Sequence, residues 1–214
     1  MQTTELNAGA QSFWDRIAPK YARKPVADQD AYDAKLSRVR SLLKPTDRVL
    51  EIGCGTGSTA MHLADSVAHI TATDISRGMI KIAQAKQDNA TSKNVTFLQV
   101  GANDTVDSQP FDAVCAFSLL HLVDDIPGVL QSVRRQLKPG GLFLSKTACL
   151  SEVNVFIRAA IVVMRVFGFA PKVTVLNAEM LAKRICEAGF EIEQISYFGA
   201  NRMSPFIVAR KVGL

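Results

Sequence analysis

Cysteine is scarce in this chain, and its four cysteines form no motif. They stand at Cys54, Cys115, Cys149 and Cys186, so no pair has the CxxC spacing of a zinc or redox site. Four cysteines in 214 residues are also too few for a disulfide framework, and we expect free thiols in a reducing compartment. The pattern excludes a disulfide-rich secreted class and predicts no metal site.

Long hydrophobic runs are missing as well. No stretch of about 18 uncharged apolar residues is present, so we expect no transmembrane segment. The most apolar region, 153–170, is interrupted by Arg158 and Arg165. The first residues, MQTTELNAGAQSFWDR, lack the basic start and apolar run of a secretory signal. These features together predict a cytoplasmic protein.

Charge of one sign is not gathered into a dense stripe. The formal net charge of +5 divides into +3 over 1–48, −5 over 49–133 and +7 over 134–214. Because the basic residues are interspersed with acids, we interpret them mainly as solvated surface, with attraction to an anionic substrate or lipid surface as the alternative. No aromatic platform accompanies them, so we expect no nucleic-acid partner.

Strand and helix patterns alternate along the chain, which indicates an α/β fold. Hydrophobic residues make up 48% of the sequence, enough for the core of one domain. A helix is expected in the first residues, where Pro25 interrupts the pattern, and further helices over 28–43, 77–87, 126–137 and 178–188. Strands are expected at 49–52, 70–73, 95–100, 111–117, 142–145, 191–198 and 205–211, with a tight turn at 139–141. We therefore predict a doubly wound, mostly parallel seven-stranded sheet with helices on both faces and an antiparallel C-terminal strand.

A glycine-rich turn follows the first predicted strand, in the run VLEIGCGTGSTA at 49–60. Glycines allow positive φ and close approach of a ligand, and the helix that follows offers free N–H groups to an anion. A dinucleotide-binding fingerprint needs glycine where this chain has Ser58, which disfavours a nicotinamide-dependent oxidoreductase. Asp74 ends the next strand, where a carboxylate can accept hydrogen bonds from both hydroxyls of a ribose. Asp74 or Ser76 would alternatively cap the following helix.

Five short motifs occur in order: EIGCGTG at 51–57, TDIS at 73–76, FDAV at 111–114, LLHL at 119–122 and LKPGG at 137–141. With them, roughly residues 45–150 resemble class I S-adenosylmethionine-dependent methyltransferases. The chain is similar to the small single-domain enzymes related to ubiquinone and menaquinone biosynthesis. The resemblance implies a Rossmann-like fold, S-adenosylmethionine as the cofactor and methyl transfer as the reaction.

The resemblance also implies which residues bind the cofactor: Glu51, Gly53, Cys54, Gly55, Gly57, Asp74, Ile75, Met79, Ala102, Asn103, Ala116 and Phe117. Asp74 would hold the ribose hydroxyls, and Ile75 and Met79 would flank the adenine, although Met79 also suits a core position. Many relatives have an aspartate where this chain has Gly101. Asn103, Asp104 or backbone groups would then bind the adenine amine.

The candidate acceptor-site residues come from outside the shared core: Trp14, Tyr21, Tyr32, His121 and Arg158. Tyr21 lies in a segment that resembles the family's N-terminal lid, and packing against Trp14 is the alternative. Tyr32 suits a core position or a pocket wall. His121 follows the fourth strand and is a candidate general base, with packing as the alternative. Tyr21 and His121 are the candidate catalytic residues.

The segment 151–170 stands where this fold commonly carries acceptor-binding elements. Ser151, Asn154, Arg158 and Arg165 share one face of a helix there, opposite a broad apolar surface. We weigh a lid over an apolar or anionic acceptor, an ordinary packed helix and an interfacial helix that touches membrane lipid. The expected organisation is a single domain over 1–214. It has a helical N-terminal lid at 1–45, a cofactor-binding core at 46–148, an acceptor-side insertion at 149–177 and a C-terminal helix and strands at 178–214.

The predicted function is methyl transfer from S-adenosylmethionine to a small-molecule acceptor, with a lipophilic one favoured by the apolar 153–170. A catalytic triad is not needed, because the cofactor supplies the reactive carbon and the protein supplies binding and orientation. The alternative is a non-catalytic module that binds S-adenosylmethionine or a nucleoside. The sequence predicts neither the acceptor atom nor the oligomeric state.

Overall fold

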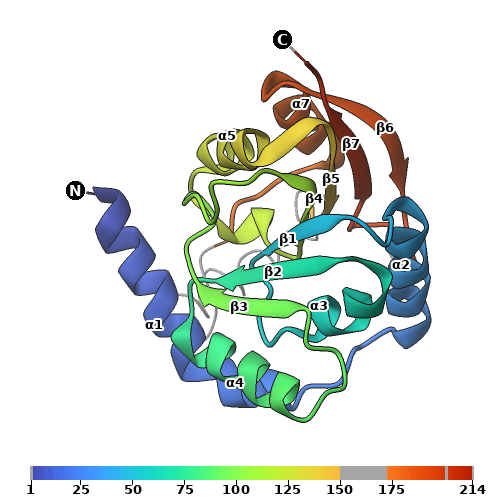
Figure 1. Ribbon diagram of the computed structural model, residues 1–214. Coiled ribbons are helices and arrows are strands. Elements are labelled where there is room, and N and C mark those ends of the chain that lie inside the picture. The colour runs from blue at the N-terminus through green and yellow to red at the C-terminus, as the bar shows by residue number, and fades with distance from the viewer. Residues whose placement is uncertain (1, 150–172, 201, 214) are drawn as a thin grey trace.

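A seven-stranded sheet forms the centre of the computed structural model, which describes residues 2–149, 173–200 and 202–213 (Figure 1). The strands are β1 (Arg48–Ile52), β2 (His69–Asp74), β3 (Val95–Gln99), β4 (Phe111–Phe117), β5 (Leu137–Lys146), β6 (Phe190–Ser196) and β7 (Phe206–Lys211). Their order across the sheet is β3-β2-β1-β4-β5-β7-β6. Strands β1 to β5 pair in parallel, whereas β7 lies antiparallel between β5 and β6. The predicted Rossmann-like sheet with an antiparallel C-terminal strand is confirmed.

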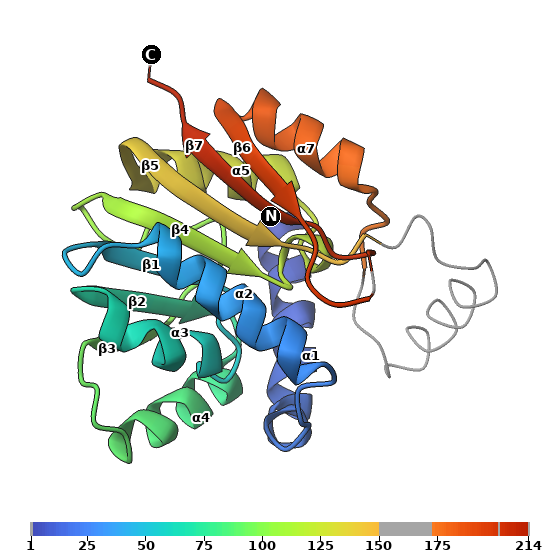
Figure 2. The same ribbon diagram turned by 90° about the vertical axis from the view of Figure 1, so that its right-hand side faces the viewer.

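Helices cover both faces of this sheet, as predicted. They are α1 (Gln2–Ala22), α2 (Gln29–Leu42), α3 (Ser58–Leu63), α4 (Arg77–Asp88), α5 (Ile126–Gln136) and α7 (Ala178–Glu187), with 3-10 turns η1 (Ala64–Ser66) and η2 (Leu120–Leu122). Leu36, Leu63 and Ile80 of α2, α3 and α4 join one hydrophobic cluster, while Leu130 and Ile185 of α5 and α7 join another. Figure 2 shows α2 and α3 in front of the sheet and α5 behind it. Burial on both faces explains why the central strands read as continuous apolar runs.

The main error in the predicted bounds concerns β5. The strand expected at 142–145 begins at Leu137 instead and runs through the segment expected to be a tight turn. The register gives the reason, because Phe111 pairs with Leu137 while Ala113 pairs with Leu142. Residues 138–141 therefore bulge within the strand, opposite Asp112. The first helix ends at Ala22, three residues before the interruption expected at Pro25, and the bounds predicted from residue 28 onward otherwise agree to within two residues.

The predicted acceptor-side helix, with Ser151, Asn154, Arg158 and Arg165, lies outside the described residues. Within the ranges that the structure describes, no helix is both long and apolar enough to cross a membrane.

The strand order brings several strand ends together at one edge of the sheet. β1 has β2 on one side and β4 on the other, so the direction of chain winding reverses at β1. Open α/β sheets bind their ligands outside the carboxyl ends of the strands at such a point. The glycine-rich turn after β1, Asp74 at the end of β2 and Phe117 at the end of β4 all lie there.

Candidate active site

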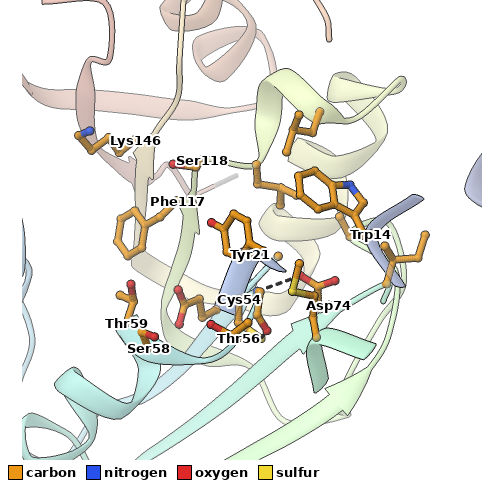
Figure 3. Close-up of a pocket in the computed structure, with 18 of the residues that line it drawn as sticks. Trp14, Tyr21, Cys54, Thr56, Ser58, Thr59, Asp74, Phe117, Ser118 and Lys146 are labelled. Atoms are coloured by element: carbon orange, nitrogen blue, oxygen red, sulfur yellow. Dashed lines mark hydrogen bonds between the residues drawn. The ribbon is translucent and has the colours of Figure 1, made fainter. Parts of the chain in front are cut away.

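A cavity of about 700 Å³ opens at this edge, a volume typical of small-molecule sites. Its wall is built from α1, α2, the glycine-rich turn and the ends of β2, β3, β4 and β5. Figure 3 shows two opposite sides of the cavity. Asp74 and Trp14 lie on one side. Phe117, Ser118 and Lys146 lie on the other.

Glycine is needed at positions 55 and 57 of the turn for different structural reasons. Gly55 has a φ of +55° and lies in the cavity wall, where an added Cβ would find only the Tyr21 ring within 4 Å, at 3.9 Å. Gly57 has a φ of +75°, and an added Cβ there would lie 2.6 Å from the Phe97 ring and 2.8 Å from Ala83. Gly57 lies outside the cavity wall and is needed for close packing against β3 and α4, and its role in cofactor binding stays a prediction.

Lys86 of α4 holds the glycine-rich turn in place. Its ammonium donates hydrogen bonds to the Thr56 carbonyl at 3.0 Å, the Thr56 hydroxyl at 2.9 Å and the Ser58 hydroxyl at 3.0 Å. Burial lowers the pKa of Lys86. Sequence reasoning missed this residue, because a lysine in the last turn of a helix normally indicates a solvated position.

Asp74 connects the turn to the start of α4. One carboxylate oxygen accepts the Gly55 N–H at 2.9 Å, and the other accepts the Ser76 N–H at 2.8 Å. The N-cap of α4 is Ser76, whose hydroxyl accepts the Met79 N–H, so Asp74 does not cap the helix. Burial raises the pKa of Asp74, while its two backbone hydrogen bonds lower it. Each oxygen keeps a lone pair for a hydroxyl of a ligand in the cavity.

Glu51 and Lys35 place two opposite charges in the same cavity wall without forming a direct ion pair. Both side chains are buried, and Glu51 Oε2 has no hydrogen-bond partner. The Lys35 ammonium lies 4.4 Å from the ring centres of Tyr32 and Phe117 and 3.5 Å from the Thr59 hydroxyl. Burial raises the pKa of Glu51 and lowers that of Lys35, and each charge opposes the shift of the other. Sequence reasoning missed Lys35, since nothing local distinguishes it from a surface lysine.

Helix α1 is fastened to the start of α4 beside this cavity. One carboxylate oxygen of Asp15 accepts hydrogen bonds from the Ser76 hydroxyl and the Gly78 N–H, both at 2.7 Å. Trp14 and Tyr21 on the same helix line the cavity, and their rings meet edge to face at 6.2 Å. Tyr21 thus has both predicted contacts, with Trp14 and with the cavity, and it is 48% exposed.

Other predicted residues also line the cavity: Cys54, Ile75, Met79, Ala102, Asn103, Phe117 and Tyr32. Tyr32 packs against the core as well, with its hydroxyl 3.2 Å from that of Thr59. At the predicted adenine position, the Gly101 N–H donates to the Asp104 carboxylate at 3.2 Å.

Besides Gly57, two described site residues of the prediction are absent from the cavity wall. Ala116 is fully buried and absent from the wall, because successive side chains of a strand point to opposite faces and Phe117 takes the cavity side. His121 lies in η2 outside the wall, and burial lowers the pKa of its imidazole to about 4. Arg158 lies outside the described residues.

Known methyltransferases are similar to this chain in sequence, over a region that includes most of the glycine-rich turn. Residues 50–143 match the family described as "Methyltransferase domain". The demethylmenaquinone methyltransferase of Clavibacter sepedonicus is 33% identical over 140 residues, covering 64% of this chain and 48% of that protein. The ubiquinone biosynthesis O-methyltransferase of Xanthomonas campestris pv. campestris (strain B100) is 32% identical over 148 residues, covering 66% and 60%. The chain thus spans less than two thirds of the length of either curated relative.

The likeness in three dimensions extends over nearly the whole chain. DhpI, solved as a complex with SAH, has a TM-score of 0.76 and 23% identity, and 98% of each chain is covered. At this identity the likeness shows the shared fold. The family match and the curated relatives show that residues 50–143 are similar to a methyltransferase domain, within a chain that shares the fold of DhpI.

Proposed function

We propose that this chain transfers a methyl group from S-adenosylmethionine to a small-molecule acceptor by in-line displacement. The observation that carries the proposal is the pair of buried opposite charges, Glu51 and Lys35, which face one cavity without pairing with each other. An uncompensated buried charge is costly, so such charges favour a ligand with complementary groups. The amino-acid end of S-adenosylmethionine has an ammonium for Glu51 and a carboxylate for Lys35.

The rest of the cavity fits the remaining parts of this cofactor. The free lone pairs of Asp74 suit the ribose hydroxyls, and the apolar side chains of Ile75 and Met79 suit a flat adenine. Asn103 and Asp104 both line the cavity next to Gly101, and the Asp104 carboxylate keeps lone pairs after accepting the Gly101 N–H, so either side chain is a candidate for the adenine amine.

The bound cofactor supplies an electrophilic methyl carbon on its sulfonium. The chain's own contribution is to fix the reactants in line, and such positioning can lower a barrier by about 7–11 kcal/mol. Trp14 and Tyr21 cover part of the cavity and would limit access of water. An acceptor that binds in its ionised form needs no protein base, which is compatible with the position of His121 outside the wall. The catalytic roles of Tyr21 and His121 stay predictions.

A small-molecule acceptor is supported by the two relatives, whose names place them in quinone biosynthesis. Apolar side chains in the wall, among them Val26, Phe117 and Leu122, support a lipophilic acceptor body. We include in the proposal the single domain over 1–214, with its lid, core, insertion and C-terminal parts. A cytoplasmic location is also proposed, and the free thiols of Cys54 and Cys115 favour it.

Calorimetric titration with S-adenosylhomocysteine (SAH) and transfer of a labelled methyl group to a metabolite extract test the proposal. We expect the wild type to bind SAH and to label an extract fraction. Asp74→Ala should weaken SAH binding at least about tenfold, since hydrogen bonds to a charged group contribute about 1.5–3 kcal/mol. Asp88→Ala, a change of an exposed aspartate at the end of α4, is the control and should bind normally.

The two readouts separate the proposed enzyme from a binding module. If the wild type fails to bind SAH, the proposal is wrong. Binding of SAH without labelling of any organic, aqueous or volatile fraction would instead support a non-catalytic module.

A further inference from the structure

We propose that the methyl acceptor carries an oxyanion, such as a carboxylate, beside an apolar or aromatic body, and that Lys146 binds this oxyanion with the hydroxyls of Ser118 and Ser204. The inference rests on the proposed function and names the class of acceptor that the same cavity takes.

Lys146 is the last residue of β5 and places a half-buried ammonium in the cavity wall. Among the described residues, none forms an ion pair or a hydrogen bond with this ammonium. Asp28 attracts it from a distance, but the Asp28 carboxylate accepts the Ala31 N–H at 2.9 Å as the N-cap of α2. Burial lowers the pKa of Lys146. A partly desolvated cation that has no partner in the described part of the chain favours an anionic ligand.

A wall of phenylalanine rings stands beside this cation. Lys146 pairs with Phe117 across β4 and β5 and with Phe206 across β5 and β7, so the three residues lie side by side in the sheet. The Phe117 and Phe206 rings stack at 6.5 Å, and the Phe198 ring meets Phe206 at 5.3 Å. Phe117 and Phe198 face the cavity, while Phe206 is fully buried behind them. A flat or apolar ligand body can pack on such a wall.

Two hydroxyls complete this end of the cavity. Ser118 has a φ of +55° and is the one residue other than glycine, within the described ranges, with a positive φ. Its N–H donates to the Lys146 carbonyl at 2.7 Å, and Figure 3 shows the two side chains at the same side of the cavity. Ser204 also lines the cavity, and the bond from the Thr147 N–H to the Pro205 carbonyl brings its loop beside Lys146. The positive φ of Ser118 is a strained backbone conformation. Such strain costs about 1–3 kcal/mol and is retained mainly at functional sites.

The other lysines of the wall that are not exposed already have a role. Lys86 holds the carbonyl and hydroxyl of Thr56, and Lys35 shares the cofactor end with Glu51. Lys146 is therefore the cation left for the second ligand. Its position beside Phe117, across the cavity from Asp74, separates it from the proposed ribose site (Figure 3).

The test uses wild-type protein saturated with SAH and titrated with benzoate, phenylacetate and 3-phenylpropanoate, each compared with its neutral amide. We expect at least one carboxylate to bind at least about tenfold more tightly than its amide. Lys146→Met should reduce this preference to less than about twofold, while Lys146→Arg should keep it. Lys183→Met is the matched control, because the Lys183 side chain is 76% exposed on α7, and it should behave as wild type.

The outcomes separate a misfolded variant, a wrong acceptor class and a wrong proposed function. SAH affinity equal to that of wild type shows that the Lys146 variants are folded. Equal binding of acids and amides, no binding of any of the three carboxylates, or a preference that survives in Lys146→Met would overturn the inference and leave the proposed function standing. Failure of wild type to bind SAH would overturn the proposed function first and this inference with it.

Discussion

Replacement of Glu51 by glutamine tests the charges at the cofactor end of the cavity, because the amide keeps the shape and removes the charge. Glu51 Oε2 is buried without a hydrogen-bond partner, so it is available to the ammonium of a ligand. A hydrogen bond to a charged group contributes about 1.5–3 kcal/mol. Its loss predicts SAH binding that is weaker by about 10- to 150-fold.

Without ligand, the same substitution should not destabilise the protein. Burial raises the pKa of Glu51 above its ordinary value of 4.5, although Lys35 opposes this shift. The folded chain therefore holds this proton more tightly than the unfolded chain does, and the wild type loses stability as the pH rises above 4.5. Glutamine does not titrate. We expect the unfolding temperature of Glu51→Gln, relative to that of wild type, to increase from about pH 5 to about pH 7.

Thermal unfolding of the ligand-free proteins at several pH values in this range, combined with SAH titration, measures both effects. Glu191→Gln on β6 is the control, since Glu191 is exposed and should give neither effect. A lower unfolding temperature for Glu51→Gln together with unchanged SAH affinity would contradict a ligand-binding role for Glu51. The carboxylate would then serve the fold and not a ligand.

Three further variants test other parts of the structure. Gly57→Ala should destabilise the protein by about 2–4 kcal/mol in chemical denaturation, because its φ is positive and the new Cβ would lie 2.6 Å from the Phe97 ring; a loss below about 0.5 kcal/mol would contradict the packing role. Asp15→Ala should cost about 1–2 kcal/mol and make α1 easier to cleave in limited proteolysis, because the Ser76 hydroxyl loses its acceptor; unchanged cleavage would show that other contacts hold the helix. His121→Ala should leave methyl transfer within about twofold of wild type from about pH 6 to about pH 9, because the imidazole has a pKa of about 4 and lies outside the wall; loss of one limb of the pH–rate profile would argue for a base.

The local parts of the site could be predicted from the sequence. The glycine-rich turn and Asp74 follow predicted strands directly, and the carboxyl ends of parallel strands meet at one edge of the sheet. Position along a strand then fixes where such residues lie. The same reasoning did not separate Ala116 from Phe117, because the alternation of side chains allows only one of two neighbours to face the cavity.

The positions of two lysines at the site could not be predicted in this way. Lys35 in the middle of α2 and Lys86 in the last turn of α4 reach the site only through the packing of these helices on the sheet. Lys35 interacts electrostatically with Glu51, and Lys86 donates hydrogen bonds to Thr56. These residues are distant in sequence, so no short motif connects them. Gly57 shows the same limit, since its neighbour Phe97 comes from another strand. Lys146 carried one readable signal, a charged residue at the carboxyl end of a buried strand.

The position of β7 has a consequence for synthesis of the protein. β6 is hydrogen-bonded to β7 and, among the described strands, to no other, yet β7 follows it along the chain. While translation has passed Ser196 but not reached Phe206, β1 to β5 can already pair, whereas β6 has no neighbour to join. The sheet is therefore completed late, when one strand inserts and attaches another in the same event. A message truncated between these two residues would yield a chain with an unpaired edge on both β5 and β6, which is a substrate for chaperones and proteases.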